Sequence, residues 1–292
     1  MEALLSQLPI GLSIAAVLML VALGLTFTFG QMGVINMAHG EFMMAGAYTA
    51  YVLQDWTGRQ AVLVALPVAF AVAGAMGLLL ERAAIRHFYG RPLDTLLLTW
   101  GVSLVLQQLA RDIFGAPNVQ VRAPEWLGGG VRIFGSQLPY TRLFIVVLAA
   151  VSVLAIWAYQ SWTRQGRRMR SVMQNRQLAA CSGVNTGRVD QLTFFIGSGV
   201  AGIAGVALTL IGPIGPNLGT YYIVDAFLVV VAGGLGRLRG AVLAALALGL
   251  LNSYAEFWTD ASLAKVIAFG AIVVFLQARP QGLFVLRTRT LT

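Results

Sequence analysis

Charged residues are scarce in this sequence. Only 11% of its 292 residues are charged, against roughly a quarter in an average soluble domain, and 58% are hydrophobic. The longest stretch between apolar runs, residues 112–140, is too short to fold around a core of its own. We therefore expect no soluble domain, and any function must lie within a membrane or in partner proteins.

Lysine, cysteine and histidine are also nearly absent. Lys265 is the only lysine and follows Ala264, so the Gly-Lys-Ser/Thr end of a phosphate-binding loop does not occur. Cys181 is the only cysteine and there are two histidines, too few for an internal disulfide or a typical zinc site. We expect no metal site, no cofactor held by this chain and no enzymatic activity of its own.

The sequence instead holds a series of apolar runs of membrane-spanning length, which for a helix is about 20 residues. Two further runs, 31–54 and 221–255, are interrupted by polar residues and glycines. Together they predict an all-α polytopic membrane protein with about eight transmembrane helices, folded as a single domain over residues 1–292. The uninterrupted runs are 10–29, 61–80, 95–110, 143–159, 191–211 and 261–278.

The basic residues predict how these helices are oriented. If segment 164–190 is cytoplasmic, most of the 20 basic residues fall on the cytoplasmic side, as the positive-inside rule requires. This assignment places the N-terminus outside and the C-terminus in the cytoplasm.

Three polar side chains, Asn36, His39 and Glu41, interrupt the run 31–54. A carboxylate inside a membrane is costly unless it is paired or hydrated, so one hypothesis is that these residues line a substrate pathway. The alternative is that Asn36 caps a helix whose first turn contains Glu41, which simply restarts the helix at the membrane edge. The spacing of two residues disfavours a proton relay between His39 and Glu41.

Asp225 and the glycine-rich stretch 233–240 interrupt the second run. Interrupted hydrophobic segments in both halves of a transporter point to its substrate route, so Asp225 joins the three polar residues of the first run as a candidate pathway residue. The alternative is that Pro213 and Pro216 shape an external turn and that 233–240 is a tight cytoplasmic turn.

A basic connector, 161–190, is the third candidate. Six arginines stand against the single acid Asp190, which suits a solvated loop beside anionic lipid. The connector also contains small apolar residues, from which a short helix can dock one face on another protein. The residues alone leave both interpretations open.

Five motifs occur in order between about Gly30 and Phe284: INMAHGEF, YGRPLDTLLLTWGVSLVLQQ, MQNRQLAACSGVNTGRVD, GPNLGTYYIVDAFLVVVAGGLG and RPQGLF. Together they resemble the permease subunits of branched-chain amino acid type ABC importers, and within that family most closely the urea permease branch. The resemblance implies a permease subunit of an ATP-driven urea importer in a bacterial plasma (inner) membrane. Importers of branched-chain amino acids or short-chain amides are alternatives, and an ATP-independent carrier or channel is a more distant one.

The resemblance also implies partners. A second homologous permease would form the other half of the pathway, two cytoplasmic ATPase subunits would use ATP and Mg, and an extracytoplasmic solute-binding protein would deliver the solute. We expect contact with membrane lipid and none with nucleic acid. The family's ATPase-docking loop corresponds to the segment 164–190 of this chain, and its predicted docking residues are Arg170, Gln174, Asn175, Arg176, Ala179, Ala180, Gly183 and Arg188.

Overall fold

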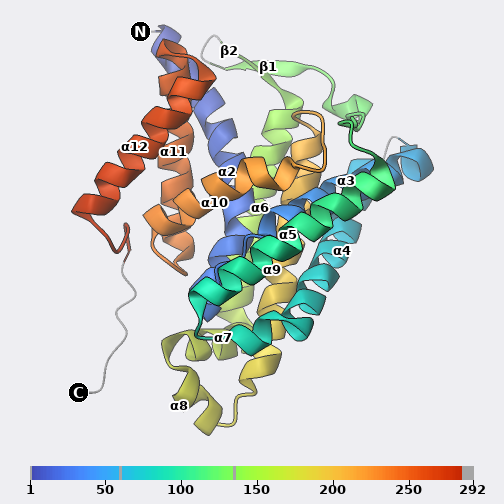
Figure 1. Ribbon diagram of the computed structural model, residues 1–292. Helices are drawn as coiled ribbons and strands as arrows, with labels where there is room; N and C mark the ends of the chain where they lie inside the picture. Colours follow the sequence, from blue (N-terminus) through green and yellow to red (C-terminus); the bar gives the residue numbers. More distant parts are fainter. Residues whose placement is uncertain (1, 59–60, 134–135, 285–292) are drawn as a thin grey trace.

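The computed structural model describes residues 2–58, 61–133 and 136–284, which form a bundle of helices with a small hairpin at one end (Figure 1). The hairpin consists of β1 (Gly130–Ile133) and β2 (Ser136–Pro139), paired antiparallel. Among the described residues, the 3₁₀ helices η2 (Ile85–Phe88) and η3 (Glu125–Leu127) lie in the connections. The α-helices are α1 (Glu2–Leu5), α2 (Gln7–Met32), α3 (His39–Thr57), α4 (Ala61–Ala83), α5 (Pro92–Phe114), α6 (Tyr140–Trp162), α7 (Arg164–Gln174), α8 (Arg176–Cys181), α9 (Thr186–Thr209), α10 (Leu218–Gly233), α11 (Leu238–Trp258) and α12 (Ala261–Ala278).

Six helices in the described part of the chain are long and apolar enough to cross a membrane: α2, α4, α5, α6, α9 and α11. Shorter apolar helices lie at α10 and α12, and α3 is 19 residues long with an acid in its first turn. The all-α membrane fold is therefore confirmed, whereas the count of eight spans stays a prediction. Opposite sides for the two chain ends require an odd number of crossings, so the eight-span count and the predicted orientation conflict; counting α3 as a further span would remove the conflict.

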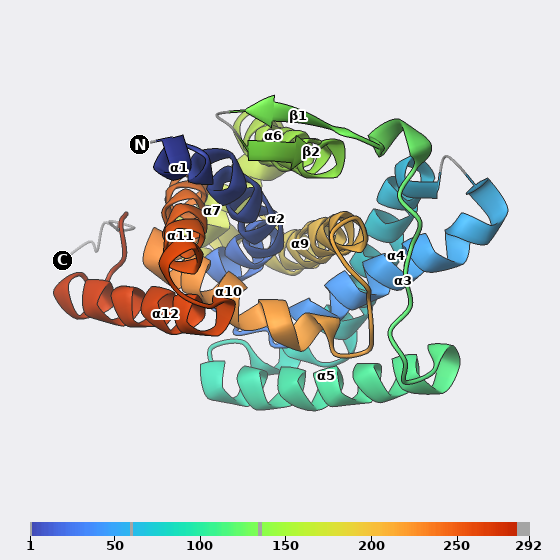
Figure 2. The ribbon, with the colours of Figure 1, turned by 90° about the horizontal axis from the view of Figure 1, so that it is seen from above.

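The core of the bundle is built on α2 and α9. In their most apolar windows, 78% of α9 and 67% of α2 are buried, against 22–39% for the other four long helices. Figure 2 shows α9 near the centre of the bundle and α5 at its edge. A helix that is apolar on all sides suits the interior of a bundle. This explains why α2, which has no charged residue, lies inside together with α9, whose charged residues Arg188 and Asp190 stand among its first five.

Small residues let these helices approach closely, as expected for packing in a membrane. A Cβ atom added at Gly77 of α4 would lie 2.0 Å from the Ser198 hydroxyl of α9. On α9, Gly197 lies against α2, and a Cβ atom at Gly205 would fall 1.9 Å from the Met43 carbonyl oxygen of α3. One helix, α9, therefore packs closely on three neighbours.

The two interrupted runs break at glycines with left-handed backbone. Gly33 ends α2 with φ +64° and donates its N–H to the Phe29 carbonyl at 2.9 Å. Between α10 and α11, Gly234 and Gly236 have φ of +92° and +73°, a conformation that glycine adopts readily. The stretch 233–240 thus contains a tight turn between two helices, as one of the two interpretations predicted.

Candidate functional sites

The starts of helices α3 and α10 meet inside the bundle. Gly40, in the first turn of α3, and Gly219, in the first turn of α10, touch through their backbones. A Cβ atom at Gly219 would lie 2.4 Å from the Gly40 carbonyl carbon. Only glycine permits this approach at both positions, so the sequence fixes the place where the starts of α3 and α10 cross.

Glu41 follows directly and is 1% exposed. Its Oε1 accepts hydrogen bonds at 2.8 Å from the Ser103 hydroxyl and from the Gln107 amide, both on α5. The Gln107 amide also donates to the Thr220 hydroxyl oxygen of α10 at 3.1 Å. Glu41 Oε2 has no hydrogen-bond partner among the described residues. We call Glu41, Ser103, Gln107 and Thr220 the Glu41 cluster. Its unpaired oxygen is buried, and a buried acceptor left unpaired is costly.

Asn36 and His39 are completely buried. His39 Nε2 lies 3.2 Å from the Val21 carbonyl of α2, while His39 Nδ1 and both polar atoms of the Asn36 side chain lack partners in the described structure. The N-cap of α3 is Ala38, so the alternative that Asn36 caps this helix is wrong. Since His39 and Glu41 contact different groups, no hydrogen bond joins them, in line with the disfavoured relay.

Asp225 lies apart from the Glu41 cluster although it shares α10 with Thr220. Its Oδ2 is 4.0 Å from the ammonium nitrogen of Lys265 on α12. Among the described residues, no hydrogen bond or ion pair joins Asp225 to the Glu41 cluster. The place of Asp225 in a substrate pathway therefore stays a prediction.

Sequence analysis missed the α5 members of the cluster because α5 reads as an ordinary apolar span. The signal was a four-residue spacing of polar side chains on this helix. The residues of this series are buried, although α5 lies at the edge of the bundle. They are Thr95, Thr99, Ser103 and Gln107.

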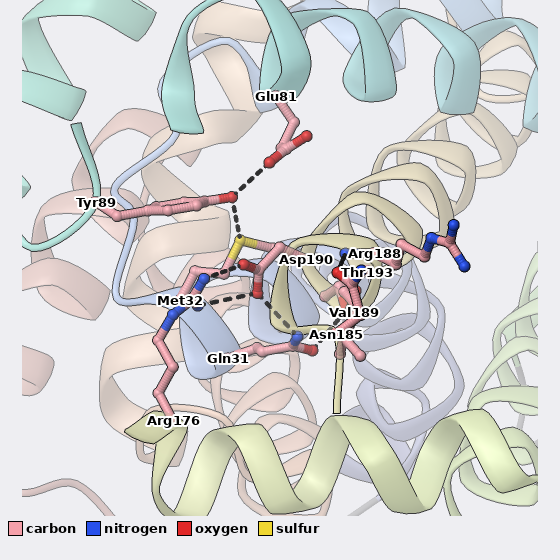
Figure 3. A network of polar contacts seen from close by, with 10 residues as sticks. All are labelled: Gln31, Met32, Glu81, Tyr89, Arg176, Asn185, Arg188, Val189, Asp190 and Thr193. Carbon is pink, nitrogen blue, oxygen red and sulfur yellow. Dashed lines mark hydrogen bonds and ion pairs between the residues drawn. The ribbon is translucent and has the colours of Figure 1, made fainter. Parts of the chain in front are cut away.

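A second buried polar network joins the connector 164–190 to the bundle (Figure 3). Arg176, the first residue of α8, forms two hydrogen bonds with the Asp190 carboxylate of α9, at 3.2 and 2.5 Å. Asp190 is completely buried and also accepts from the Gln31 amide of α2 at 3.4 Å. The Gln31 side-chain oxygen accepts from the Thr193 hydroxyl at 2.5 Å.

The same arginine contacts an aromatic ring. The Arg176 guanidinium carbon lies 5.1 Å from the centroid of the Tyr89 ring, within cation–π range. The Tyr89 hydroxyl donates to Glu81 of α4 at 2.8 Å and lies 3.5 Å from the Met32 sulfur of α2. Burial raises the pKa of Tyr89, so the phenol remains a neutral donor. We call Gln31, Met32, Glu81, Tyr89, Arg176, Asp190 and Thr193 the Arg176 network.

The structure separates the predicted docking residues into two groups. Asn175 caps α8 by accepting the Leu178 backbone N–H at 3.0 Å, and Ala179 is buried beneath α8. Leu178 points outward and is 54% exposed. Arg176 bonds inward to Asp190 although its side chain is 42% exposed. Five further predicted docking residues are exposed as well: Arg170, Gln174, Ala180, Gly183 and Arg188.

The bundle, with its closely packed apolar helices, is that of a polytopic membrane protein. Residues 8–276 match the family described as branched-chain amino acid transport system / permease component, and the chain belongs to this family. It is thus a permease component of an ABC transport system and not the ATPase.

Relatives match over nearly the whole chain. The chain is 28% identical to the high-affinity branched-chain amino acid transport system permease protein LivH of Escherichia coli (strain K12), over 96% of this chain and 94% of that protein. It is 30% identical to the corresponding protein BraD of Pseudomonas aeruginosa, over 96% and 95%. It is 27% identical to the ribose import permease protein RbsC of Escherichia coli (strain K12), over 80% and 73%.

Proposed function

We propose that this chain is the permease subunit of an ATP-driven importer and that its substrate route follows the buried face of α5. The observation that carries the proposal is that α5 is polar inside and apolar outside. Its buried residues recur every four positions and are polar from Thr95 to Gln107, whereas Leu97 and Val105 are 62% and 66% exposed. Polar side chains facing the interior of a membrane bundle are typical of a solute or ion path.

The non-helical segment 33–38, which contacts the buried face of α5, also supports a substrate route there. Thr99 accepts a hydrogen bond from the Met37 backbone N–H at 3.0 Å. Its hydroxyl oxygen lies 3.2 Å from the Ile35 carbonyl oxygen and 2.8 Å from the Thr95 carbonyl oxygen within α5. Non-helical backbone at membrane depth is tolerated where protein or a water-filled cavity satisfies it. The ends of broken helices frame the substrate sites of many transporters, and here the Glu41 cluster lies where the start of α3, just after the break at 33–38, meets the start of α10.

The solute that we propose first is urea. Urea is neutral and offers N–H donors, which suit the unpaired Glu41 oxygen, together with a carbonyl that accepts from amide or hydroxyl groups. The motif resemblance to the urea permease branch supports this choice. Branched-chain amino acids are the second candidate, because LivH and BraD are named for them; their ammonium group also suits Glu41. Short-chain amides are a third.

The proposed assembly contains a second homologous permease, two cytoplasmic ATPase subunits that use ATP and Mg, and an extracytoplasmic solute-binding protein. It lies in a bacterial plasma (inner) membrane with the connector 164–190 in the cytoplasm. In this arrangement the exposed side of α7 and α8 receives an ATPase. The family membership of the chain supports these partners.

The test is uptake into proteoliposomes that hold the full complex, supplied with binding protein and ATP, with urea, acetamide and leucine compared under the same conditions. We expect urea accumulation that requires ATP. Accumulation of leucine instead of urea would support the ATP-driven importer but would make leucine, and not urea, its solute. Uptake without ATP, or driven by a pH gradient, would reject the importer in favour of a carrier.

A further inference from the structure

We propose that Arg176 is an internal coupling residue that ties the docking helix α8 to both walls of the substrate route, and that it is not itself an ATPase contact. This inference rests on the proposed function, because coupling has a meaning only in an ATP-driven importer. It reverses the role that the sequence assigned to Arg176.

The first arm of the link runs from α8 to α2. Asp190 is completely buried, whereas the Arg176 side chain is 42% exposed. A buried carboxylate that loses its cation is strongly destabilised, so α8 and the start of α9 are held together. Asp190 also accepts from Gln31, which lies in the last turn of α2, two residues before the left-handed Gly33.

The second arm runs from α8 to α5. The Arg176 guanidinium lies over the Tyr89 ring, and Tyr89 stands three residues before α5 begins at Pro92. The Tyr89 hydroxyl contacts Glu81 and Met32, which fixes this ring against α4 and the last residue of α2. Figure 3 shows the guanidinium between the carboxylate and the ring.

Both arms end where the proposed route begins. Met32 precedes the non-helical segment 33–38, whose backbone bonds to Thr99 of α5. One arm therefore reaches this segment and the other reaches α5, the two walls that meet at the Glu41 cluster. A displacement of α8 by a docked ATPase would be transmitted through the Arg176 side chain to both the segment 33–38 and α5.

The outward side of α8 remains free for docking. Leu178 and Ala180 are exposed there, and Ala179 is buried on the opposite side. Asn175 caps the helix. Arg176 and Ala180 are four residues apart and lie on one side of α8, but the Arg176 guanidinium bonds to Asp190 and lies over Tyr89, which leaves Leu178 and Ala180 for contact with the ATPase.

The experiment compares Arg176→Gln with wild type in the full complex. The matched control is Arg132→Gln, at an exposed arginine of strand β1 that lies outside both the network and the proposed docking surface. Three quantities are measured: ATPase retained after purification, ATP hydrolysed, and solute taken up per ATP. We expect Arg176→Gln to keep the ATPases and to lower uptake per ATP about tenfold, the order of effect seen for coupling residues. Arg176→Lys, which keeps the charge, should recover part of the loss.

Two results would overturn the proposal: loss of the ATPases from the Arg176→Gln complex, or unchanged uptake per ATP. If the variant does not fold, Tyr89 supplies the second test. Tyr89→Leu removes the ring and should lower uptake per ATP, whereas Tyr89→Phe keeps the ring and should lower it less. Equal uptake per ATP for Tyr89→Leu and Tyr89→Phe would reject the link from Arg176 to α5 through the Tyr89 ring. Absence of ATP-dependent uptake in the wild-type complex would instead reject the importer itself.

Discussion

The Glu41 cluster and the Arg176 network each surround a buried acid, but they hold it differently. Glu41 receives only neutral donors, and one of its oxygens has no partner among the described residues. Asp190 has a cation on both oxygens and an amide besides. An unpaired acceptor suits a group that exchanges partners, whereas a charge-assisted, bidentate pair suits one that stays in place. This difference fits the roles that we propose, a substrate route at the Glu41 cluster and attachment of α8 at the Arg176 network.

The largest expected effect comes from Gly219→Ala, which should disrupt the Glu41 cluster and leave the Arg176 network in place. The added methyl would lie 2.4 Å from the Gly40 carbonyl carbon, so α3 and α10 must separate and the Glu41 cluster must open. Overpacking of this kind costs about 1–3 kcal/mol. We expect a lower melting temperature in detergent and loss of uptake.

Gly101→Ala is the matched control, because a Cβ atom at Gly101 of α5 meets nothing within 4 Å. Alanine is the better helix former by about 1 kcal/mol, so this variant should melt at or above the wild-type temperature. Equal melting of Gly219→Ala and wild type would mean that the contact between α3 and α10 is not tight.

The second largest effect is the loss of solute uptake expected from Glu41→Gln. Glu41→Gln keeps the size of the side chain and an oxygen that accepts from the Gln107 amide and the Ser103 hydroxyl, but it replaces the unpaired Oε2 with an N–H donor. We expect uptake to fall about tenfold, equivalent to about 1.4 kcal/mol, with the melting temperature and the bound ATPases unchanged. Normal uptake would remove Glu41 from the route, and a loss of stability alone would assign it a structural role.

The contrast between the two sites also explains what the sequence could predict. Apolar runs and glycines identified the spans and the breaks, because bilayer thickness and backbone conformation act locally along the chain. Which polar side chains bond to one another depends instead on how the helices pack in three dimensions, and no local pattern in the sequence shows this. Ser103 and Gln107 were hidden in an apolar run, and Asp190 was counted as one acid among six arginines. Asn36 failed as a cap because α3 begins at His39, which leaves Asn36 in the non-helical segment.

A third, smaller effect concerns the docking face of α8. Cys181 is the only cysteine in the sequence and is exposed at the end of α8, so a maleimide reports directly on this surface. We expect bound ATPase to slow the labelling of Cys181 severalfold, measured by mass spectrometry of the intact chain. Arg176→Gln should leave this protection in place; if protection were lost, Arg176 would belong to the docking face.

The smallest effect is expected at Asp225, which tests whether the passage extends beyond the Glu41 cluster. Its Oδ2 lies 4.0 Å from the Lys265 ammonium, whose side chain is 63% exposed, and exposed ion pairs contribute about 0–1 kcal/mol. Asp225→Asn should therefore change uptake less than about threefold and leave the melting temperature within a few degrees. A loss as large as that of Glu41→Gln would instead place Asp225 on the route, because its pairing with Lys265 alone is too weak to produce such a loss.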